Sequence, residues 1–237
     1  MSIALKALVV PAIAKHTASV IFIHGLGDTG FGWKPVMDMY RADPELRHVK
    51  WILPHAPTQS VTANMGIEMP SWFDIYSFGF DSEEDKDGML KSKGLINKLV
   101  EDEITDGIEP SRIFLGGFSQ GGAMTLLTGL TSEYKLAGLA VLSGWQPLRK
   151  DFKSMISQHA TSMSIFWGHG ALDPLVQLRL ATASIDFLDK TVGIPRAAKA
   201  GETGVSFNVY QGQGHTTCPE ELDELKGTIK KCIPASS

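Results

Sequence analysis

Short apolar runs alternate along the whole chain with stretches in which hydrophobic residues return every three or four positions. Such runs are typical of buried strands, and the periodic stretches are typical of amphipathic helices. The runs predict strands at residues 19–24, 49–53, 112–116, 136–142, 164–169 and 205–210. The periodic stretches predict helices at about residues 33–42, 89–105, 120–131, 175–190 and 219–232. The alternation indicates an α/β fold, with a mostly parallel central sheet and helices on both faces.

The length and composition of the chain fit one large core. The chain has 237 residues, 43% of them hydrophobic, and no Pro-, Ser- or charge-rich linker divides it. We therefore expect a single domain over residues 1–237. The connection between residues 142 and 164 is too short for a separate cap domain over the sheet.

The charge distribution argues against two classes of partner. The formal net charge is −4, with both signs interspersed along the chain. A nucleic-acid-binding protein needs a basic stripe, and a protein that binds anionic lipid through charge needs a polybasic patch. The sequence contains neither, so we expect no nucleic-acid partner.

The cysteines and the N-terminus indicate a reducing compartment. Cys218 and Cys232 are the two cysteines, and the helix predicted between them would hold them about 20 Å apart at 1.5 Å per residue. A disulfide between them is then excluded. Residues 3–14 are interrupted by Lys6 and Pro11 and do not resemble a secretory leader. We expect a cytoplasmic protein without a membrane span.

A serine between glycines is the strongest candidate for chemistry. Gly117-Phe118-Ser119-Gln120-Gly121 follows a predicted buried strand and precedes a predicted helix. This is the context of a nucleophile elbow, in which a strained turn exposes the serine hydroxyl and the glycines make room for the flanking strand and helix. The alternative is an ordinary glycine-rich turn, because 24 of the 237 residues are glycine.

A second glycine motif suggests a different class of protein. Residues 25–30 have the spacing of a dinucleotide-binding fingerprint, which would indicate an oxidoreductase. We expect residues 31–35, which include Pro35, to delay any helix after these glycines. The next predicted strand ends in Pro54-His55 and lacks the acidic residue that would bind a ribose. A turn whose N–H groups point into a site at the edge of the sheet is the better interpretation.

A base and an acid follow the serine in the order that a hydrolase of this architecture requires. His215 lies just past the last predicted strand, beyond every candidate acid. Asp173 follows the strand at 164–169, whereas Asp186 and Asp189 fall on the polar face of a helix. The alternatives are a loop histidine and a helix N-cap before Pro174. Cys218, close to His215, is a rival nucleophile.

Two segments are longer than a simple connection needs. Residues 54–80 are rich in apolar side chains without a clear period, and long loops in compact domains are usually functional. This loop must cover the sheet or bind a ligand. Residues 193–204 are small and polar, and we expect a surface excursion there.

Several blocks of sequence, in order, resemble the acyl-protein thioesterases, a small carboxylesterase and lysophospholipase-like branch of the α/β-hydrolases. The matching blocks are residues 22–28, 70–74, 116–122, 142–145 with 147–148, 169–170 with 173–176, and 214–215. Together they run from about residue 15 to the C-terminus, which is more specific than the serine motif alone. The resemblance implies the α/β-hydrolase fold.

The resemblance also implies roles for individual residues. Ser119, Asp173 and His215 would form a catalytic triad, with the backbone N–H groups of Leu26 and Gln120 as the oxyanion hole. A hydrophobic acyl channel would lie near the apolar loop, and the candidate acyl-binding residues are Met65, Ile67, Met69, Trp72, Phe73, Trp145 and Leu172. Packing over the sheet is the alternative for that loop.

The implied activity is hydrolysis of long-chain acyl thioesters on S-acylated proteins, with side activity on esters and lysophospholipids. The substrates would be the partners, with transient contact at a membrane surface and no metal or organic cofactor. The alternatives are a general carboxylesterase or lysophospholipase, the oxidoreductase, and a binding protein that retains an inactive triad.

The chain departs from the family in a few places. Many animal members have a lipidatable cysteine after the initiator methionine, where this chain has Ser2. Trp167, His169 and residues 193–204 also differ in detail from the family pattern. None of these departures affects the three candidate triad residues.

Overall fold

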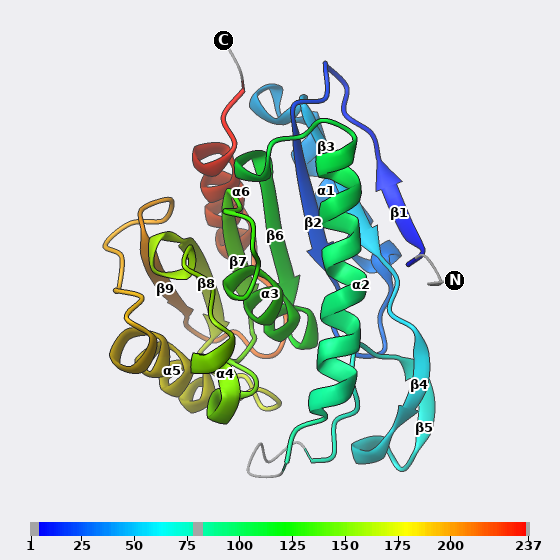
Figure 1. Cartoon of the computed structure of the whole chain (residues 1–237), viewed down its shortest axis with the longest axis vertical. Coiled ribbons are helices and arrows are strands. Elements are labelled where there is room, and N and C mark those ends of the chain that lie inside the picture. Colours follow the sequence, from blue (N-terminus) through cyan, green and yellow to red (C-terminus); the bar gives the residue numbers. More distant parts are fainter. Residues whose placement is uncertain (1–4, 78–82, 236–237) are drawn as a thin grey trace.

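The computed structural model, which describes residues 5–77 and 83–235, has a seven-stranded central sheet with helices on both faces (Figure 1). The strands lie in the order β1-β3-β2-β6-β7-β8-β9, and all are parallel except β1. Their bounds are β1 Ala7–Val10, β2 Ala18–Ile23, β3 Val49–Pro54, β6 Ile113–Phe118, β7 Gly138–Leu142, β8 Ser164–Gly170 and β9 Gly204–Tyr210. A separate hairpin pairs β4, Thr58–Val61, with β5, Ile67–Pro70. The predicted α/β class is confirmed.

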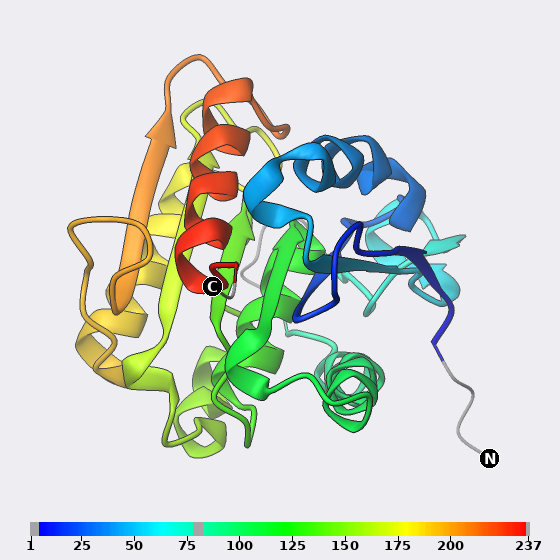
Figure 2. The same ribbon diagram turned by 90° about the horizontal axis from the view of Figure 1, so that it is seen from above.

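The helices divide between the two faces of the sheet (Figure 2). Their bounds are α1 Gly30–Ala42, α2 Lys86–Thr105, α3 Gln120–Leu130, α4 Arg149–Met155, α5 Leu178–Phe187 and α6 Pro219–Cys232. A π-helical segment, Leu188–Val192, continues α5. Short 3-10 turns lie at Pro44–Leu46, Thr62–Asn64, Pro110–Arg112 and Ala160–Ser162. Helices α1 and α6 cover one face and share one hydrophobic cluster, while the other four pack on the opposite face.

Three strands and one helix are absent from the sequence-based prediction. Strands β4 and β5 contain polar residues and form no apolar run, while β1 is apolar throughout but only four residues long, between Lys6 and Pro11. Helix α4 has seven residues and buries only Phe152, which is too little for a helical period. The expectation that residues 54–80 form a loop is therefore wrong for β4 and β5, and residues 78–80 lie outside the described part.

The expected delay of the first helix is also wrong. Helix α1 begins at Gly30, with Thr29 as its N-cap, and Pro35 lies inside it. Proline removes one backbone donor, which a helix tolerates best near its N-terminus. A Cβ at Gly30 would lie 2.2 Å from the Leu53 carbonyl oxygen, so the glycine allows α1 to approach β3 closely. Within the 193–204 segment, Arg196 forms an isolated parallel bridge with Val205.

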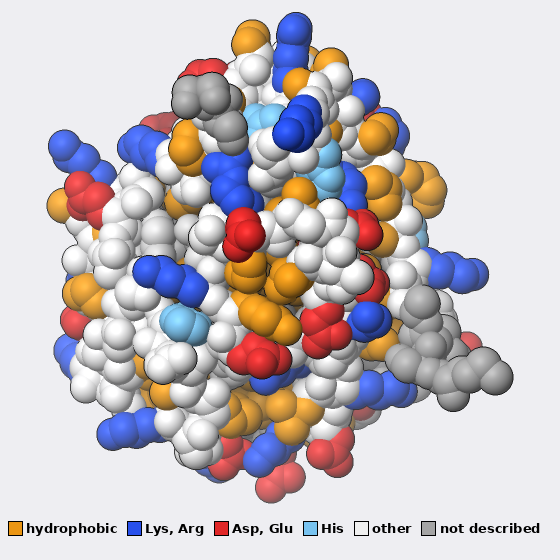
Figure 3. All heavy atoms as spheres, turned by 45° about the horizontal axis from the view of Figure 1, so that its top comes forward, with side chains coloured by type: hydrophobic (Ala, Val, Ile, Leu, Met, Phe, Trp, Pro, Cys, Tyr) orange, Lys and Arg blue, Asp and Glu red, His pale blue; other side chains and the backbone are white. Residues whose placement is uncertain are grey.

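The surface carries charges of both signs. On the face shown in Figure 3, Lys and Arg side chains are interspersed with Asp and Glu side chains. Among the described residues, no helix combines the length and the apolar composition needed to cross a membrane. Cys218 and Cys232 are free thiols, as the predicted helix between them requires.

Two glycines of β8 let α6 and the loop before it approach the sheet. A Cβ at Gly168 would lie 2.1 Å from Oε1 of Glu221, and a Cβ at Gly170 would lie 2.4 Å from the Gly214 carbonyl oxygen. The Glu221 side chain, which packs against Gly168, is completely buried. Burial, together with the neighbouring charge of Glu224, raises the pKa of Glu221 to about 8. The loop that carries His215 therefore rests on the strand through backbone contacts.

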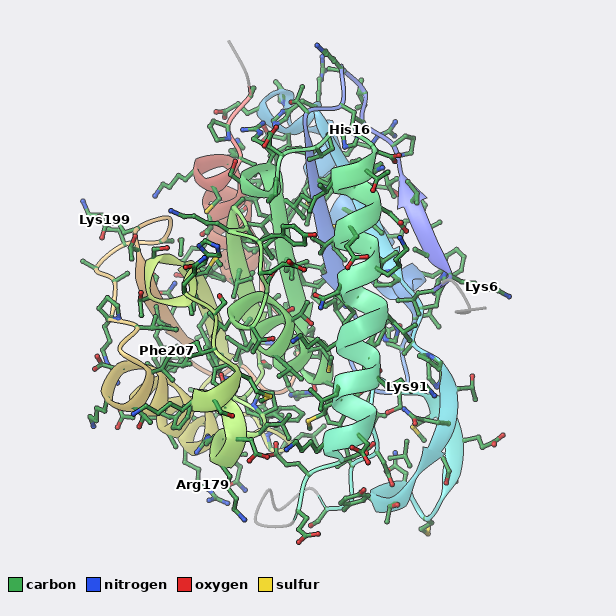
Figure 4. The ribbon with its side chains drawn as sticks, viewed as in Figure 1. Lys6, His16, Lys91, Arg179, Lys199 and Phe207 are labelled. Carbon is green, nitrogen blue, oxygen red and sulfur yellow. The ribbon has the colours of Figure 1, made fainter. Side chains whose placement is uncertain are left out.

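A buried ion pair ties β2 and β3 to the C-terminal end of α2, near the labelled His16 in Figure 4. Lys50 Nζ lies 2.5 Å from Glu103 Oε1, and Ser19 donates its hydroxyl to Glu103 Oε2 at 2.5 Å. Glu103 is 4% exposed. Asp106 also faces Lys50, at 3.8 Å, but its side chain is 66% exposed. Lys50 therefore has one buried acidic partner, Glu103, and one exposed acidic partner, Asp106.

We predict that Glu103→Ala lowers the free energy of unfolding by about 2–3 kcal/mol, because Lys50 and Ser19 lose their buried partner. Asp106→Ala is the matched control and should change it by less than about 0.5 kcal/mol, because exposed pairs contribute little. Urea denaturation of both variants measures this difference. Equal losses in the free energy of unfolding would show that the buried pair contributes no more to stability than the exposed pair.

We predict that Glu221→Gln stabilises the protein increasingly as the pH rises. Below the ordinary glutamate pKa of 4.5 both states of the wild type hold the proton; above it the unfolded state ionises while the folded state keeps its proton up to about pH 8. Wild-type stability therefore falls between these limits, by up to about 5 kcal/mol, and the glutamine variant avoids this loss. Urea denaturation at several pH values tests it, with exposed Glu220→Gln as the control; parallel curves for wild type and Glu221→Gln would contradict it.

Candidate active site

The turn from β6 into α3 has the geometry of a nucleophile elbow. Ser119 lies between the two elements at φ 54° and ψ −117°, a backbone conformation that non-glycine residues rarely adopt. A Cβ at Gly117 would lie 2.3 Å from the Gly121 carbonyl oxygen, and a Cβ at Gly121 would lie 2.0 Å from that of Ile23. The Ser119 N–H donates to the Leu142 carbonyl at 2.8 Å. Both glycines are therefore required for the close packing that holds the serine in this turn.

Two loops bring an imidazole and a carboxylate to this serine. His215 follows β9, and Asp173 follows β8. His215 Nε2 lies 2.9 Å from Ser119 Oγ, and His215 Nδ1 lies 2.7 Å from Asp173 Oδ2. The His215 ring also packs against the Phe118 ring, with 4.8 Å between centroids. The three residues singled out from the sequence thus form one continuous chain of hydrogen bonds.

Asp173 is fixed by backbone donors as well as by the histidine. Its Oδ1 accepts hydrogen bonds from the N–H groups of Leu175 and Val176, both at 2.9 Å. Burial by itself raises the pKa of Asp173, but the hydrogen bonds and the charge of His215 outweigh burial, and the net shift is downward. Helix α5 begins only at Leu178, so Asp173 closes a turn and is not the helix N-cap.

A second histidine, His169, packs against the loop that carries Asp173. His169 is completely buried, and burial lowers its pKa, so the neutral form is favoured. In that form its Nε2–H donates to the Val176 carbonyl at 2.7 Å. Nε2 also lies 3.7 Å from Asp173 Oδ2. His169 therefore packs against both ends of the turn that Asp173 closes.

Two backbone N–H groups are available at the elbow. Leu26 lies in the turn after β2, and Gln120 is the first residue of α3. Within residues 5–77 and 83–235, neither N–H group has an acceptor. The Gln120 side chain is occupied, because its Oε1 accepts from the Trp72 N–H at 2.9 Å and its Nε2 donates to the Phe73 carbonyl at 2.8 Å. These hydrogen bonds connect the segment around Trp72 to the turn that carries Ser119.

A cavity of about 380 Å³ opens onto Ser119. Its lining is largely apolar and comprises Gly25, Leu26, Asp28, Asn64, Ile75, Phe118, Ser119, Trp145, Leu175, Val176 and His215. A size near the lower end of small-molecule sites and an apolar wall suit a ligand with a hydrocarbon chain.

The residues expected to bind an acyl chain lie in four different environments. Trp145 lines the cavity, and Met69 is half-buried beside the turn at Gly27. Trp72 and Phe73 are buried in the core, each 1% exposed. The solvent-exposed members are Met65, Ile67 and Leu172, which are 90%, 54% and 68% exposed. Of the seven candidates, only Trp145 therefore contributes to the cavity wall.

The sequence reasoning missed most of the cavity wall. Phe118 is adjacent to Ser119, and Leu175 and Val176 come just after Asp173, so proximity to the candidate triad could have suggested them. Ile75 belongs to the apolar 54–80 segment, but no periodicity distinguishes it from its neighbours. Only the tertiary structure places these side chains around one space.

The rival readings of the sequence lack this geometry. Both ring nitrogens of His215 are engaged by Ser119 and Asp173, while Cys218 occupies the N-cap position of α6. The first glycine of the 25–30 motif lies against the elbow, because a Cβ at Gly25 would be 3.3 Å from Ser119 Cβ. The turn that this motif forms thus belongs to the same site as the serine.

Comparisons with known proteins identify the family of the chain. A family model described as Phospholipase/Carboxylesterase matches residues 5–233. Acyl-protein thioesterase 1 of Cryptococcus neoformans is 43% identical, over 98% of this chain and 100% of that protein. Acyl-protein thioesterase 1 of Neurospora crassa is 42% identical, over 96% of this chain and 91% of that protein.

Solved structures show the same architecture. Arabidopsis thaliana SOBER1 matches 92% of this chain and 99% of its own with a TM-score of 0.83 and 32% identity. Zea mays acyl-protein thioesterase 2 matches 96% of this chain and 99% of its own with a TM-score of 0.82 and 28% identity. The chain belongs to the phospholipase/carboxylesterase family and has the α/β-hydrolase fold.

Proposed function

We propose that the chain is a serine hydrolase that cleaves long-chain acyl thioesters on S-acylated proteins, with Ser119 as nucleophile, His215 as base and Asp173 as the acid that orients the base. The unbroken chain of hydrogen bonds from Ser119 Oγ through His215 to Asp173 carries the proposal. The thioesterase names of the relatives from Cryptococcus neoformans and Zea mays support the choice of substrate.

The reaction follows from the positions of these groups. His215 takes the hydroxyl proton as Ser119 Oγ attacks the acyl carbonyl, and the protonated ring is stabilised by Asp173. The N–H groups of Leu26 and Gln120 bind the oxyanion. His215 then protonates the leaving group where needed and activates the water that hydrolyses the acyl-enzyme. No step calls on a metal or organic cofactor.

The same site suits oxyesters, which makes a carboxylesterase or lysophospholipase the second candidate. A cysteine thiol has a pKa of about 8.5 and leaves readily as a thiolate, whereas an alkoxide needs more assistance from His215. The description of the matching family as Phospholipase/Carboxylesterase favours this broader activity. Binding of the substrate, rather than the chemistry, would then decide between the two.

The cavity supplies the acyl-binding part of the proposal. Ile75, Trp145 and Leu175 offer apolar surface next to Ser119, and burial of each methylene group contributes about 0.8 kcal/mol. The connection between β7 and β8 contains only α4 and one 3-10 turn among its regular elements. An entrance without a cap domain suits an acyl chain that is presented on a protein surface.

The cellular setting is part of the same proposal. Two free cysteines are usual in a reducing compartment, which favours the cytoplasm. S-acylated proteins lie at membrane surfaces, so the enzyme would contact these surfaces transiently while it binds its substrate. Ser2, where many animal relatives have a lipidatable cysteine, lies outside the described residues.

We predict that Ser119→Ala lowers turnover of an octanoyl thioester by about 10⁴-fold or more, since the nucleophile is lost. A fluorophosphonate should add once to the wild type, and intact-mass analysis should find no adduct on the variant. The control is Cys218→Ser, which should retain both labelling and turnover. An undiminished adduct on Ser119→Ala would contradict the assignment of the nucleophile.

We predict that Leu175→Ala lowers kcat/KM for an octanoyl thioester relative to an acetyl thioester by about 3- to 10-fold, because it removes apolar surface from the cavity. Leu172→Ala is the same substitution three residues away, at an exposed side chain that does not line the cavity. It should leave the ratio unchanged. If Leu172→Ala alone altered the ratio, the acyl chain would lie on the outer surface instead.

A further inference from the structure

One carboxylate interrupts the largely apolar wall of the catalytic cavity. Asp28 lines this cavity together with Ile75, Trp145 and the Ser119 hydroxyl. No Lys or Arg among the described residues lines it, and Asp28 forms no ion pair with any of them. The wall therefore presents a negative charge that neither the elbow nor the proposed triad requires.

The backbone holds this carboxylate in place. The Asp28 N–H donates to the Gly25 carbonyl at 3.3 Å, and Asp28 Oδ1 accepts the Thr29 N–H at 2.7 Å. A Cβ at Gly32 would lie 2.3 Å from Asp28 Oδ2, so the second oxygen rests on the first turn of α1. The N-terminal end of this helix is favourable for negative charge. Asp28 is thus fixed at the cavity.

The turn that carries Asp28 begins at Gly25, which packs directly against Ser119. The would-be Cβ of Gly25 lies 3.3 Å from Ser119 Cβ, and Asp28 is only three residues further along the same turn. Asp28 and Ser119 line the same cavity, so a substrate whose carbonyl lies at Ser119 places the groups next to its thioester in the electrostatic field of the Asp28 carboxylate. Over such distances a unit charge is only partly screened at ordinary ionic strength.

We propose that Asp28 selects the substrate by charge, favouring S-acylated cysteines that are flanked by basic side chains over those flanked by acidic ones. This inference rests on the proposed thioesterase function and names the class of acylated segment. A positive charge beside the scissile thioester is attracted to Asp28, and a negative charge is repelled, with no Lys or Arg in the cavity wall to compensate.

A purely structural role for Asp28 makes a different prediction. If the carboxylate only stabilises the start of α1, then asparagine, which retains an acceptor oxygen and nearly the same shape, should preserve both the fold and the substrate preference. Under the charge-selection proposal, the same substitution should preserve the shape and reduce the preference. The ratio of two substrates on one enzyme separates these cases, because any common loss of activity cancels.

The experiment compares three S-octanoyl-cysteine peptides that differ only in a flanking pair of Lys, Gln or Glu residues. We expect wild type to favour the Lys peptide over the Glu peptide in kcat/KM, and Asp28→Asn to reduce that ratio by about 3- to 10-fold. The control is Asp102→Asn, which makes the same change in net charge on the exposed side of α2 and should leave the ratio unchanged.

Two results would overturn the proposal: an unchanged ratio in Asp28→Asn, or an equal fall in Asp102→Asn. Should Asp28→Asn fail to fold, the wild-type ratio decides, because it must shrink as ionic strength rises from about 0.01 M to 0.15 M and the Debye length falls from about 30 Å to 8 Å. A ratio that is insensitive to salt contradicts the proposal. Failure of wild type to hydrolyse even the Gln peptide would instead refute the thioesterase function.

Discussion

The close approach of α3 to β6 and β2 at Gly117 and Gly121 is the constraint on which the site depends. Side chains at these positions would collide with backbone atoms, at 2.3 Å from the Gly121 carbonyl oxygen and 2.0 Å from that of Ile23. Because backbone cannot move aside as a flexible side chain can, the two glycines fix the turn between them. Ser119 is held in a costly conformation there, and the packing of α3, whose residues are all buried, compensates for that cost. The strain is thus maintained by the core rather than by the site itself.

The order of strands brings the remaining groups to the same place. Strands β2, β6, β8 and β9 are parallel, so the loops after them all emerge at one edge of the sheet. Leu26 follows β2, Ser119 follows β6, Asp173 follows β8 and His215 follows β9. The His215 loop reaches the serine because Gly170 lets the backbone at residue 214 lie directly on β8. Close backbone packing therefore positions the proposed base as well as the proposed nucleophile.

The sequence predicted those parts of the molecule that repeat a local pattern. The buried parallel strands are continuous apolar runs, and the order of Ser119, Asp173 and His215 is readable because each follows such a run. Strands β4 and β5 were missed because polar residues interrupt them, and β1 was missed because its apolar run has only four residues. Helix α1 begins before Pro35 because packing against β3 outweighs a local preference. Most of the cavity wall was not predicted, because residues such as Ile75 and Leu175 meet only through contacts between distant segments.

The groups proposed to perform the chemistry and those proposed to select the substrate are held in place differently. The proposed nucleophile, base and oxyanion donors are positioned by backbone contacts and glycines, which leave little freedom for substitution. Asp28, Ile75 and Leu175 line the cavity from three different loops. Replacing one of these side chains alters the shape or charge of the wall without moving the elbow. A fold of this kind can therefore acquire new acyl substrates by changing the wall while the backbone of the elbow stays the same.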